Sequence, residues 1–212
     1  MLLYSGKSCS DIKSHSSQAV TASYVIDPDG EGGYEQFTVY CDMTDKNKVG
    51  VTVVSHDSEA RTLVSGYEGA GSYVRHVHYI APGLTGLEQL AGLSSASTHC
   101  EQFIKYECHH NPLLFNGDKY GWWVSRNGES TAYWGGATPA DSYKCACGLT
   151  NSCANPSYGC NCDINDGEWR EDSGILTEKS DLPVLQLRFG DTGGSIESGY
   201  HTLGKFKCYG NA

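Results

Sequence analysis

The sequence lacks a long apolar run and a cluster of basic residues. None of its apolar runs approaches the roughly 18 residues that a membrane-spanning helix needs, so direct membrane insertion is not expected. Lys and Arg total 15 against 25 Asp and Glu, which gives a net charge of −10. Because phosphate backbones are bound by gathered Lys and Arg, nucleic acid is not an expected partner. The acidic balance suits a cation, calcium above all.

Motifs typical of common catalytic sites are also absent. There is no nucleophile elbow, no paired-carboxylate pattern and no His-Glu-x-x-His zinc motif. The single Asp-Thr-Gly at 191–193 lacks the strand context and second copy of an aspartic protease, and we interpret it as a loop. We therefore expect a protein that is not an enzyme. No Asn-x-Ser/Thr acceptor for N-glycosylation occurs, and Asn151-Ser152-Cys153 is only the rare cysteine variant.

Cysteine is what the chain has in quantity. Apolar residues make up 39% and charged residues 19% of 212 residues, which predicts a globular chain with a hydrophobic core. An even number of cysteines in a Gly- and Tyr-rich chain predicts a disulfide framework and a secreted or extracellular location. Residues 1–6 are too short for a signal peptide, so this location rests on the cysteines. The ten are Cys9, Cys41, Cys100, Cys108, Cys145, Cys147, Cys153, Cys160, Cys162 and Cys208.

Sequence alone leaves most of the pairing open. We favour a Cys100–Cys108 bridge over a zinc site that uses the neighbouring histidines, because the spacing matches no common zinc finger. Cys145 and Cys147 have one residue between them, so we expect them to bond outward within the run 153–162. That run and this pair hold five cysteines, so one partner must come from elsewhere.

Hydrophobic alternation predicts strands at four places, namely 36–41, 51–55, 72–79 and 185–190. Short helices are expected at 10–17 and around 84–104. The second of these begins with Thr85 as N-cap and Glu88 three residues on. Residues 111–172 are dense in Gly, Asn, Asp and Cys, which is typical of irregular loops held by disulfides.

Three N-terminal segments resemble the fibrinogen C-terminal-like domain, and they are Cys9–Ile12, Tyr24–Gly30 and Phe37–Met43. Further segments are similar to the fibrinogen-like domain of contactin-associated proteins and neurexin IV. These are Val54–Glu59, His99–Gln102, Trp122–Gly128, Tyr133–Gly136, Cys145–Gly148, Cys160–Asp163 and Leu182–Val184. The resemblance covers nearly the whole chain, from Cys9 to Cys208.

The resemblance implies an α+β fold with one domain over 9–208. It implies a small N-terminal subdomain (9–50) in which a helix and two strands are stapled by a Cys9–Cys41 bridge. A central twisted antiparallel sheet would come from 51–110 and 182–208, and 111–172 would form an irregular, disulfide-braced binding region. The family's members are neuronal and septate-junction adhesion receptors, so the resemblance also implies an extracellular binding role.

Aromatic residues gather in the loop-rich segment, where they suit the stacking of sugar rings. Trp122 and Trp123 are adjacent, so at least one of them should face the core. Trp134 precedes two glycines and is expected at the surface. With Tyr133 and Tyr158 it forms the aromatic part of the predicted ligand site. Asn127 and Asp141 are the polar residues expected to complete that site.

An acidic loop follows at 163–168. Calcium is bound by six to eight oxygens, and Asp and Asn at close spacing before a glycine can supply several of them. The predicted metal ligands are Asp163, Asn165, Asp166 and Glu168. The alternative is an ordinary acidic turn, because the loop does not fit an EF-hand.

The sequence therefore predicts a secreted recognition domain, glycan-binding or adhesive, with calcium as the candidate cofactor. The alternatives are a protein–protein adhesion module without a sugar site, and a matrix- or mineral-associated structural protein. The expected partners are glycans or extracellular glycoproteins, and self-association into a homo-oligomer is compatible with this function.

Overall fold

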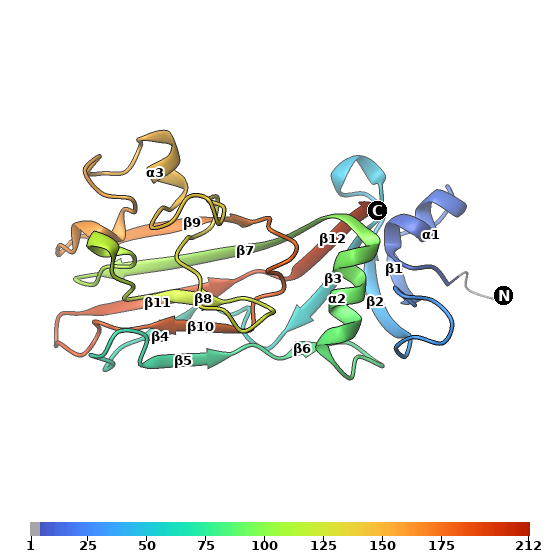
Figure 1. Cartoon of the computed structure of the whole chain (residues 1–212), viewed down its shortest axis with the longest axis horizontal. Coiled ribbons are helices and arrows are strands. Elements are labelled where there is room, and N and C mark those ends of the chain that lie inside the picture. The colour runs from blue at the N-terminus through green and yellow to red at the C-terminus, as the bar shows by residue number, and fades with distance from the viewer. Residues whose placement is uncertain (1–4) are drawn as a thin grey trace. The chain divides into compact units, whose positions relative to one another are not determined.

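The computed structural model describes residues 5–212. Residues 1–4, part of the segment interpreted as too short for a signal peptide, lie outside the described residues. The chain divides into two compact units (Figure 1). Unit 1 holds the chain up to Asp57, Tyr79–Glu101 and Lys205–Ala212, and unit 2 holds Ser58–His78 and Gln102–Gly204. None of the helices in the described range is long and apolar enough to cross a bilayer.

Unit 1 is an antiparallel sheet with two helices. Its strands follow the order β1-β2-β3-β12-β7, with β6 beside β3. Only residues 97–101 of β7 belong to this unit. Its elements are α1 (Cys9–His15), β1 (Ala22–Ile26), β2 (Phe37–Asp42), η1 (Lys46–Lys48), β3 (Val51–His56), β6 (Tyr79–Ile80), α2 (Leu87–Ala96), the start of β7 (Ser97–His109) and β12 (Phe206–Asn211).

Unit 2 contains two antiparallel sheets. One has the order β9-β7-β11-β4 and the other β5-β10-β8. Its elements are β4 (Thr62–Val64), β5 (Tyr73–His76), the rest of β7, η2 (Phe115–Gly117), β8 (Trp122–Val124), α3 (Ala146–Thr150), η3 (Cys162–Ile164), β9 (Arg170–Leu176), β10 (Gln186–Phe189) and β11 (Ser198–Leu203).

The core of unit 2 is aromatic. Successive residues of β7 alternate between buried and half-buried, so even-numbered positions such as Tyr106 point inward. The Tyr106 ring stacks on Phe189 of β10, and Phe189 also contacts Trp134 and His201. The other side of the same sheet, with the odd-numbered β7 residues, is left open.

The predicted fold class is confirmed, with antiparallel sheets, few short helices and five disulfides. The strands expected at 36–41, 51–55 and 185–190 appear as β2, β3 and β10. The segment 72–79 divides into β5 and β6, but its alternation holds, because 73, 75, 77 and 79 are less exposed than their neighbours. The predicted domain boundary at 9–208 and its subdivisions stay predictions.

The helix expected around 84–104 is wrong in its second half. Helix α2 ends at Ala96, and the chain then enters β7. From Cys100 onward the residues alternate between buried and half-buried, a period of two that no amphipathic helix can satisfy. The N-cap is Gly86, not Thr85. The side-chain oxygen of Gln89 accepts the backbone N–H of both.

The disulfides confirm part of the predicted framework. Cys9–Cys41 is present, and Cys145 and Cys147 bond outward to Cys160 and Cys153. The predicted Cys100–Cys108 bridge is wrong. Both residues lie on β7, and eight residues of extended strand separate them by about 26 Å. Cys100 instead pairs with Cys208, and Cys108 pairs with Cys162.

Candidate functional site

Trp134 is not at the surface, so its predicted exposure is wrong. Its side chain is fully buried, and the indole Nε1–H donates to the main-chain oxygen of Asp172 at 3.0 Å. The following glycines serve close packing. A Cβ on Gly135 would lie 2.7 Å from the carbonyl carbon of Gly174 in β9, closer than carbon atoms approach without a bond. The glycine pair therefore brings the loop against β9 and does not expose Trp134.

Trp122 and Trp123 follow the prediction that at least one of them lies in the core. Trp123 is fully buried, and its Nε1–H donates to the Tyr133 main-chain oxygen at 3.0 Å. Trp122 is half-buried.

The other predicted ligand residues are held by separate partners. Tyr133 is buried, its hydroxyl donates to Asp181 at 2.9 Å, and burial, followed by this bond, raises the pKa of its phenol. Tyr158 is half-buried, with its ring 5.5 Å from that of Phe115. Within residues 5–212, no hydrogen bond or ring contact joins any two of the five predicted ligand residues, apart from the chain neighbours Tyr133 and Trp134. Their role in ligand binding stays a prediction.

The two polar members of that set are engaged locally. The exposed Asn127 amide donates to the main-chain oxygen of Ser180 at 3.3 Å. The Asp141 carboxylate accepts the Thr138 hydroxyl at 2.7 Å, and this bond lowers the pKa of Asp141.

The predicted calcium ligands do not converge. Asp163 is 1% exposed and accepts the backbone N–H groups of Leu113 and Leu114, and burial raises its pKa. Asp166 pairs with Arg170, whose Nη2 lies 2.7 Å from its carboxylate and lowers its pKa.

Asn165 and Glu168 are exposed. In the part of the chain that the structure describes, the groups of three or more acidic, Cys or His residues close enough to share an ion lie elsewhere. Calcium binding stays a prediction.

The exposed side of the sheet β9-β7-β11-β4 carries a group of side chains that sequence reasoning missed. We call it the open face, and it consists of Arg61, Leu63, Lys105, Glu107, His109, Trp169, Glu171, Ile175 and Tyr200. Strand pairing sets four of them in one row across the sheet, in the order Leu63, Tyr200, Glu107 and Glu171.

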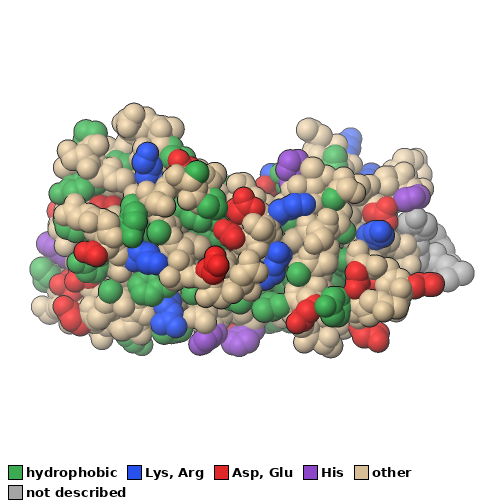
Figure 2. Space-filling model, in the orientation of Figure 1, with side chains coloured by type: hydrophobic (Ala, Val, Ile, Leu, Met, Phe, Trp, Pro, Cys, Tyr) green, Lys and Arg blue, Asp and Glu red, His purple; other side chains and the backbone are tan. Residues whose placement is uncertain are grey.

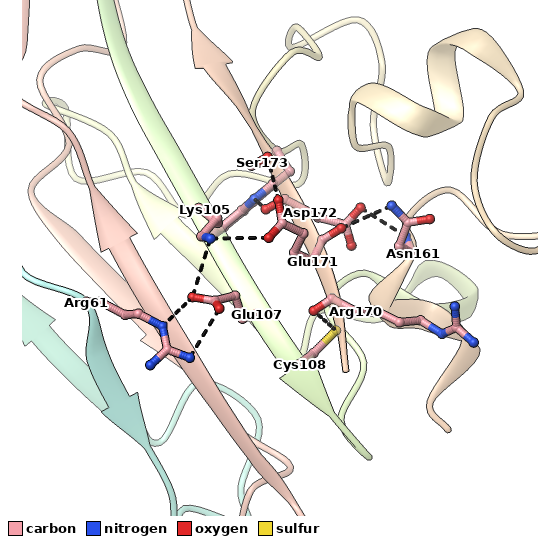
Figure 3. A network of polar contacts seen from close by, with 10 residues as sticks. Arg61, Lys105, Glu107, Cys108, Asn161, Arg170, Glu171, Asp172 and Ser173 are labelled. Carbon is pink, nitrogen blue, oxygen red and sulfur yellow. Dashed lines mark hydrogen bonds and ion pairs between the residues drawn. The ribbon is translucent and has the colours of Figure 1, made fainter. Parts of the chain in front are cut away.

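Charged side chains fill the middle of the open face (Figure 3). Arg61 makes two hydrogen bonds to the Glu107 carboxylate, at 2.8 and 3.1 Å. Lys105 lies 3.5 Å from Glu107 and 3.2 Å from Glu171. The bond from Arg61 is the main reason that the pKa of Glu107 is lowered. Two cations therefore face two anions, and the network is neutral.

An aromatic group adjoins this network. Trp169 is 54% exposed, and its ring centroid lies 5.2 Å from that of His109 and 5.7 Å from that of Tyr200. The Arg61 guanidinium carbon is 3.3 Å from the centre of the Tyr200 ring. His109 Nδ1 donates to the main-chain oxygen of Ile196 at 2.7 Å, which fixes the imidazole. Trp, Tyr and Arg thus form one braced, accessible surface.

This residue combination is suited to recognition. Trp, Tyr and Arg are the types enriched where binding energy concentrates in protein interfaces. Side chains that are already held by neighbours lose little freedom when a partner covers them. Acidic and basic side chains are interspersed over the surface that Figure 2 shows. That surface therefore has no large positive patch of the kind that binds a polyanion.

No family model matches the chain. It is 38% identical over 193 residues, or 90% of its length, to Contactin-associated protein 1 of Rattus norvegicus and of Homo sapiens. It is 37% identical over 194 residues, or 88% of its length, to Neurexin-4 of Drosophila melanogaster. The matched part is 14% of the first two proteins and 15% of the third, so the chain spans a small portion of these relatives. The predicted resemblance is confirmed.

Proposed function

We propose that this chain, a fibrinogen-like domain of the kind carried by contactin-associated proteins and neurexin-4, is an extracellular recognition and adhesion module that binds through the open face. Trp169 is the observation that carries the proposal. More than half of this large aromatic side chain is exposed, yet two neighbouring rings hold it in place. Burying a side chain of this size against a partner contributes roughly 1.5–3 kcal/mol.

The extracellular location is part of the proposal, and two observations support it. All ten cysteines are paired in five disulfides, which persist in oxidising compartments. The relatives identified above cover nine tenths of the chain.

The function that we propose is binding, not catalysis, because the sequence holds no recognisable set of nucleophile, base and orienting group.

A glycan is the first partner class that we propose. The flat Trp169 ring can stack on the C–H face of a sugar. The carboxylate and guanidinium of the neighbouring Glu107–Arg61 pair can bond its hydroxyls. Because the charges of the open face cancel, a neutral glycan suits it better than a sulfated or sialylated one. Calcium dependence through 163–168 is the finer form of this proposal, and it requires Asp166 to leave Arg170.

A protein partner is the second class. The name of two relatives states that they associate with contactin. The Trp, Tyr and Arg composition of the open face also suits a protein interface. A contactin ectodomain is therefore the defined protein probe for this chain.

The test measures binding of the purified, disulfide-intact chain to a glycan array and, by interferometry, to a contactin ectodomain. Trp169→Ala should weaken whichever binding is observed at least tenfold. Tyr34→Ala is the matched control, because Tyr34 is a 53% exposed aromatic residue of unit 1 and should leave binding unchanged. If Trp169→Ala binds as well as the parent, the open face is not the binding surface.

The two classes and the calcium requirement separate in the same experiment. Binding on the array but not to contactin supports a lectin, and the reverse supports a protein–protein module. Each measurement is repeated with calcium and with EDTA. If affinity and Tm are the same in both, the calcium part of the proposal fails while the recognition function stands.

A further inference from the structure

A seven-residue loop of unit 2 presents an exposed asparagine. Cys147 and Cys153 close this loop, with their Cα atoms 4.7 Å apart. Helix α3 ends inside it at Thr150, and the C-cap residue Asn151 adopts the left-handed conformation with φ 53° and ψ 36°. Asn151 and Ser152 are exposed and Cys153 is buried. Within residues 5–212, no hydrogen bond engages the side-chain amide of Asn151.

We propose that Asn151 is an N-glycosylation site that is modified before the Cys147–Cys153 bridge closes. The transferase recognises Asn followed two positions later by a side chain that can hydrogen-bond the Asn amide. A thiol is a weak donor and acceptor, so Cys153 replaces the usual hydroxyl with lower efficiency. Asn155-Pro156-Ser157 is not a competing site, because proline stands in its middle position.

The reaction joins a sugar to the side-chain nitrogen. The donor is a polyprenyl diphosphate-linked oligosaccharide, and a membrane-bound oligosaccharyltransferase catalyses the transfer. The bond between sugar C1 and the phosphate oxygen breaks, and a bond between C1 and Asn151 Nδ2 forms. The polyprenyl diphosphate leaves with the bonding electrons, and Nδ2 loses one proton to a base of the transferase.

The bridge and the modification compete for Cys153. Oxidation removes the thiol that the acceptor sequence needs, and it fixes Asn151 in a tight turn. Transfer must therefore precede bridge closure, and only part of the chains should be modified. Once the bridge has formed, the exposed position of Asn151 lets a glycan project into solvent without displacing buried side chains.

Asn151 itself lines a depression of about 300 Å³ together with Tyr143 and Pro156, and its chain neighbours line the depression next to the open face. Thr150 and Ser152, its two neighbours, line a depression of about 410 Å³ together with Glu171 and Ser173 of β9. Glu171 belongs to the charged network of the open face. The modification would therefore limit how a large partner approaches the β9 edge.

The test expresses the full chain in a eukaryotic secretory cell line and measures occupancy of Asn151 by peptide mass spectrometry with and without peptide N-glycosidase. The parent should show partial occupancy, and Asn151→Gln should show none. Cys147→Ser keeps the acceptor sequence but removes the competing partner, so occupancy should rise at least twofold. Cys147→Ser with Cys153→Ser creates Asn-Ser-Ser and should bring occupancy close to completion.

Transfer precedes folding, so occupancy is read equally well on protein retained in the cell if a variant is not secreted. An unmodified Asn151 in both the parent and Cys147→Ser would overturn the proposal, with the double variant showing that the transferase reached this segment. If the double variant is also unmodified, the segment is not an acceptor and the proposal is equally overturned. Neither result depends on the ligand-binding assay above.

Discussion

The rings of Tyr106 and Phe189 stack with their planes 6° apart and their centroids 4.2 Å apart. Tyr106 comes from β7 and Phe189 from β10, so this pair joins the two sheets of unit 2. The ring centroids of Trp134 and His201 lie 6.1 and 5.8 Å from that of Phe189. Phe189 is therefore the centre of the core that supports the open face from behind.

Replacing Phe189 should destabilise the protein strongly. Phe189→Ala would leave a cavity among four rings, those of Tyr73, Tyr106, Trp134 and His201, and such truncations cost about 3–5 kcal/mol. Phe189→Leu fills much of the space and should cost less than half of that. Urea denaturation of both variants measures the difference. A Phe189→Ala protein with the parent's midpoint would show that the two sheets are not held by this ring.

Asp172 should make the protein more stable as the pH falls. Its carboxylate is 3% exposed and accepts the backbone N–H of Asn161 and Cys162, each at 2.9 Å. Burial is the main cause that raises its pKa from 3.8 to about 6. The folded state therefore binds a proton before the unfolded chain does. The stabilisation is fully present below pH 3.8 and is lost as pH rises through 6.

Asp172→Asn tests this dependence, because the amide has nearly the same shape and does not titrate. The free energy of unfolding of the parent minus that of the variant should be larger at pH 5 than at pH 7, by about 1–2 kcal/mol. Urea titrations at both pH values give this difference. A difference that is the same at both would mean that Asp172 titrates near its ordinary range.

His201 should make the protein less stable as the pH falls, over a pH range that overlaps that of Asp172. Its ring is buried, its Nε2 lies 2.9 Å from the Tyr73 hydroxyl, and burial lowers its pKa from 6.5 to about 4. The unfolded chain takes up the proton first, so stability falls by about 1.4 kcal/mol per pH unit from 6.5 toward 4.

His201→Phe keeps an aromatic ring against Phe189 and removes the titration. The stability of the parent relative to this variant should decrease steadily between pH 7 and pH 4.5, as measured by urea midpoints. A parent and variant with parallel pH profiles would contradict a neutral, buried His201.

The disulfides should contribute different amounts to the free energy of unfolding, according to the lengths of the loops that they close. Cys100–Cys208 spans 108 residues and Cys147–Cys153 spans 6. In the loop-entropy picture, replacing the first pair by alanine costs about 4–5 kcal/mol and replacing the second about 2 kcal/mol. Denaturation of the two double variants without reductant gives both values. Equal losses would show that native contacts, not chain entropy, dominate.

Local patterns predicted β2, β3 and β10, the segment that divides into β5 and β6, and the loop-rich character of 111–172, because alternation and turn-rich composition are properties of neighbouring residues. They predicted a helix over the start of β7 and did not predict β9 or β11. The Cys9–Cys41 bridge came from the resemblance to a family. The prediction of a Cys100–Cys108 bridge was wrong because the two residues are close in sequence but not in space. An extended strand holds them apart. The predicted exposure of Trp134 was wrong because the two glycines that follow it do not mark a surface loop. They instead allow the chain to approach Gly174 closely.

The open face was beyond the reach of sequence reasoning for a related reason. Arg61 and Glu107 are 46 residues apart, and Tyr200 lies still further along the chain. Only the register of β4, β11 and β7 sets them in contact. Trp169 was visible as a tryptophan, but nothing near it in the sequence says that His109 and Tyr200 flank it. Long-range strand pairing, not local pattern, makes this surface.

The Cys100–Cys208 bridge has a mechanical consequence. Tension along the main chain would pass from Cys100 to Cys208 through the sulfur–sulfur bond, so the residues between them would carry no load. Trp169, Glu107 and Tyr200 all lie inside this shielded loop. Arg61 lies outside it, on the stretch between Cys41 and Cys100 that no bridge shortens. Tension on that stretch would reach β4 and, when it extends β4, would withdraw Arg61 from Glu107 and Tyr200. The open face would then change while β9, β11 and most of β7 lie inside the shielded loop.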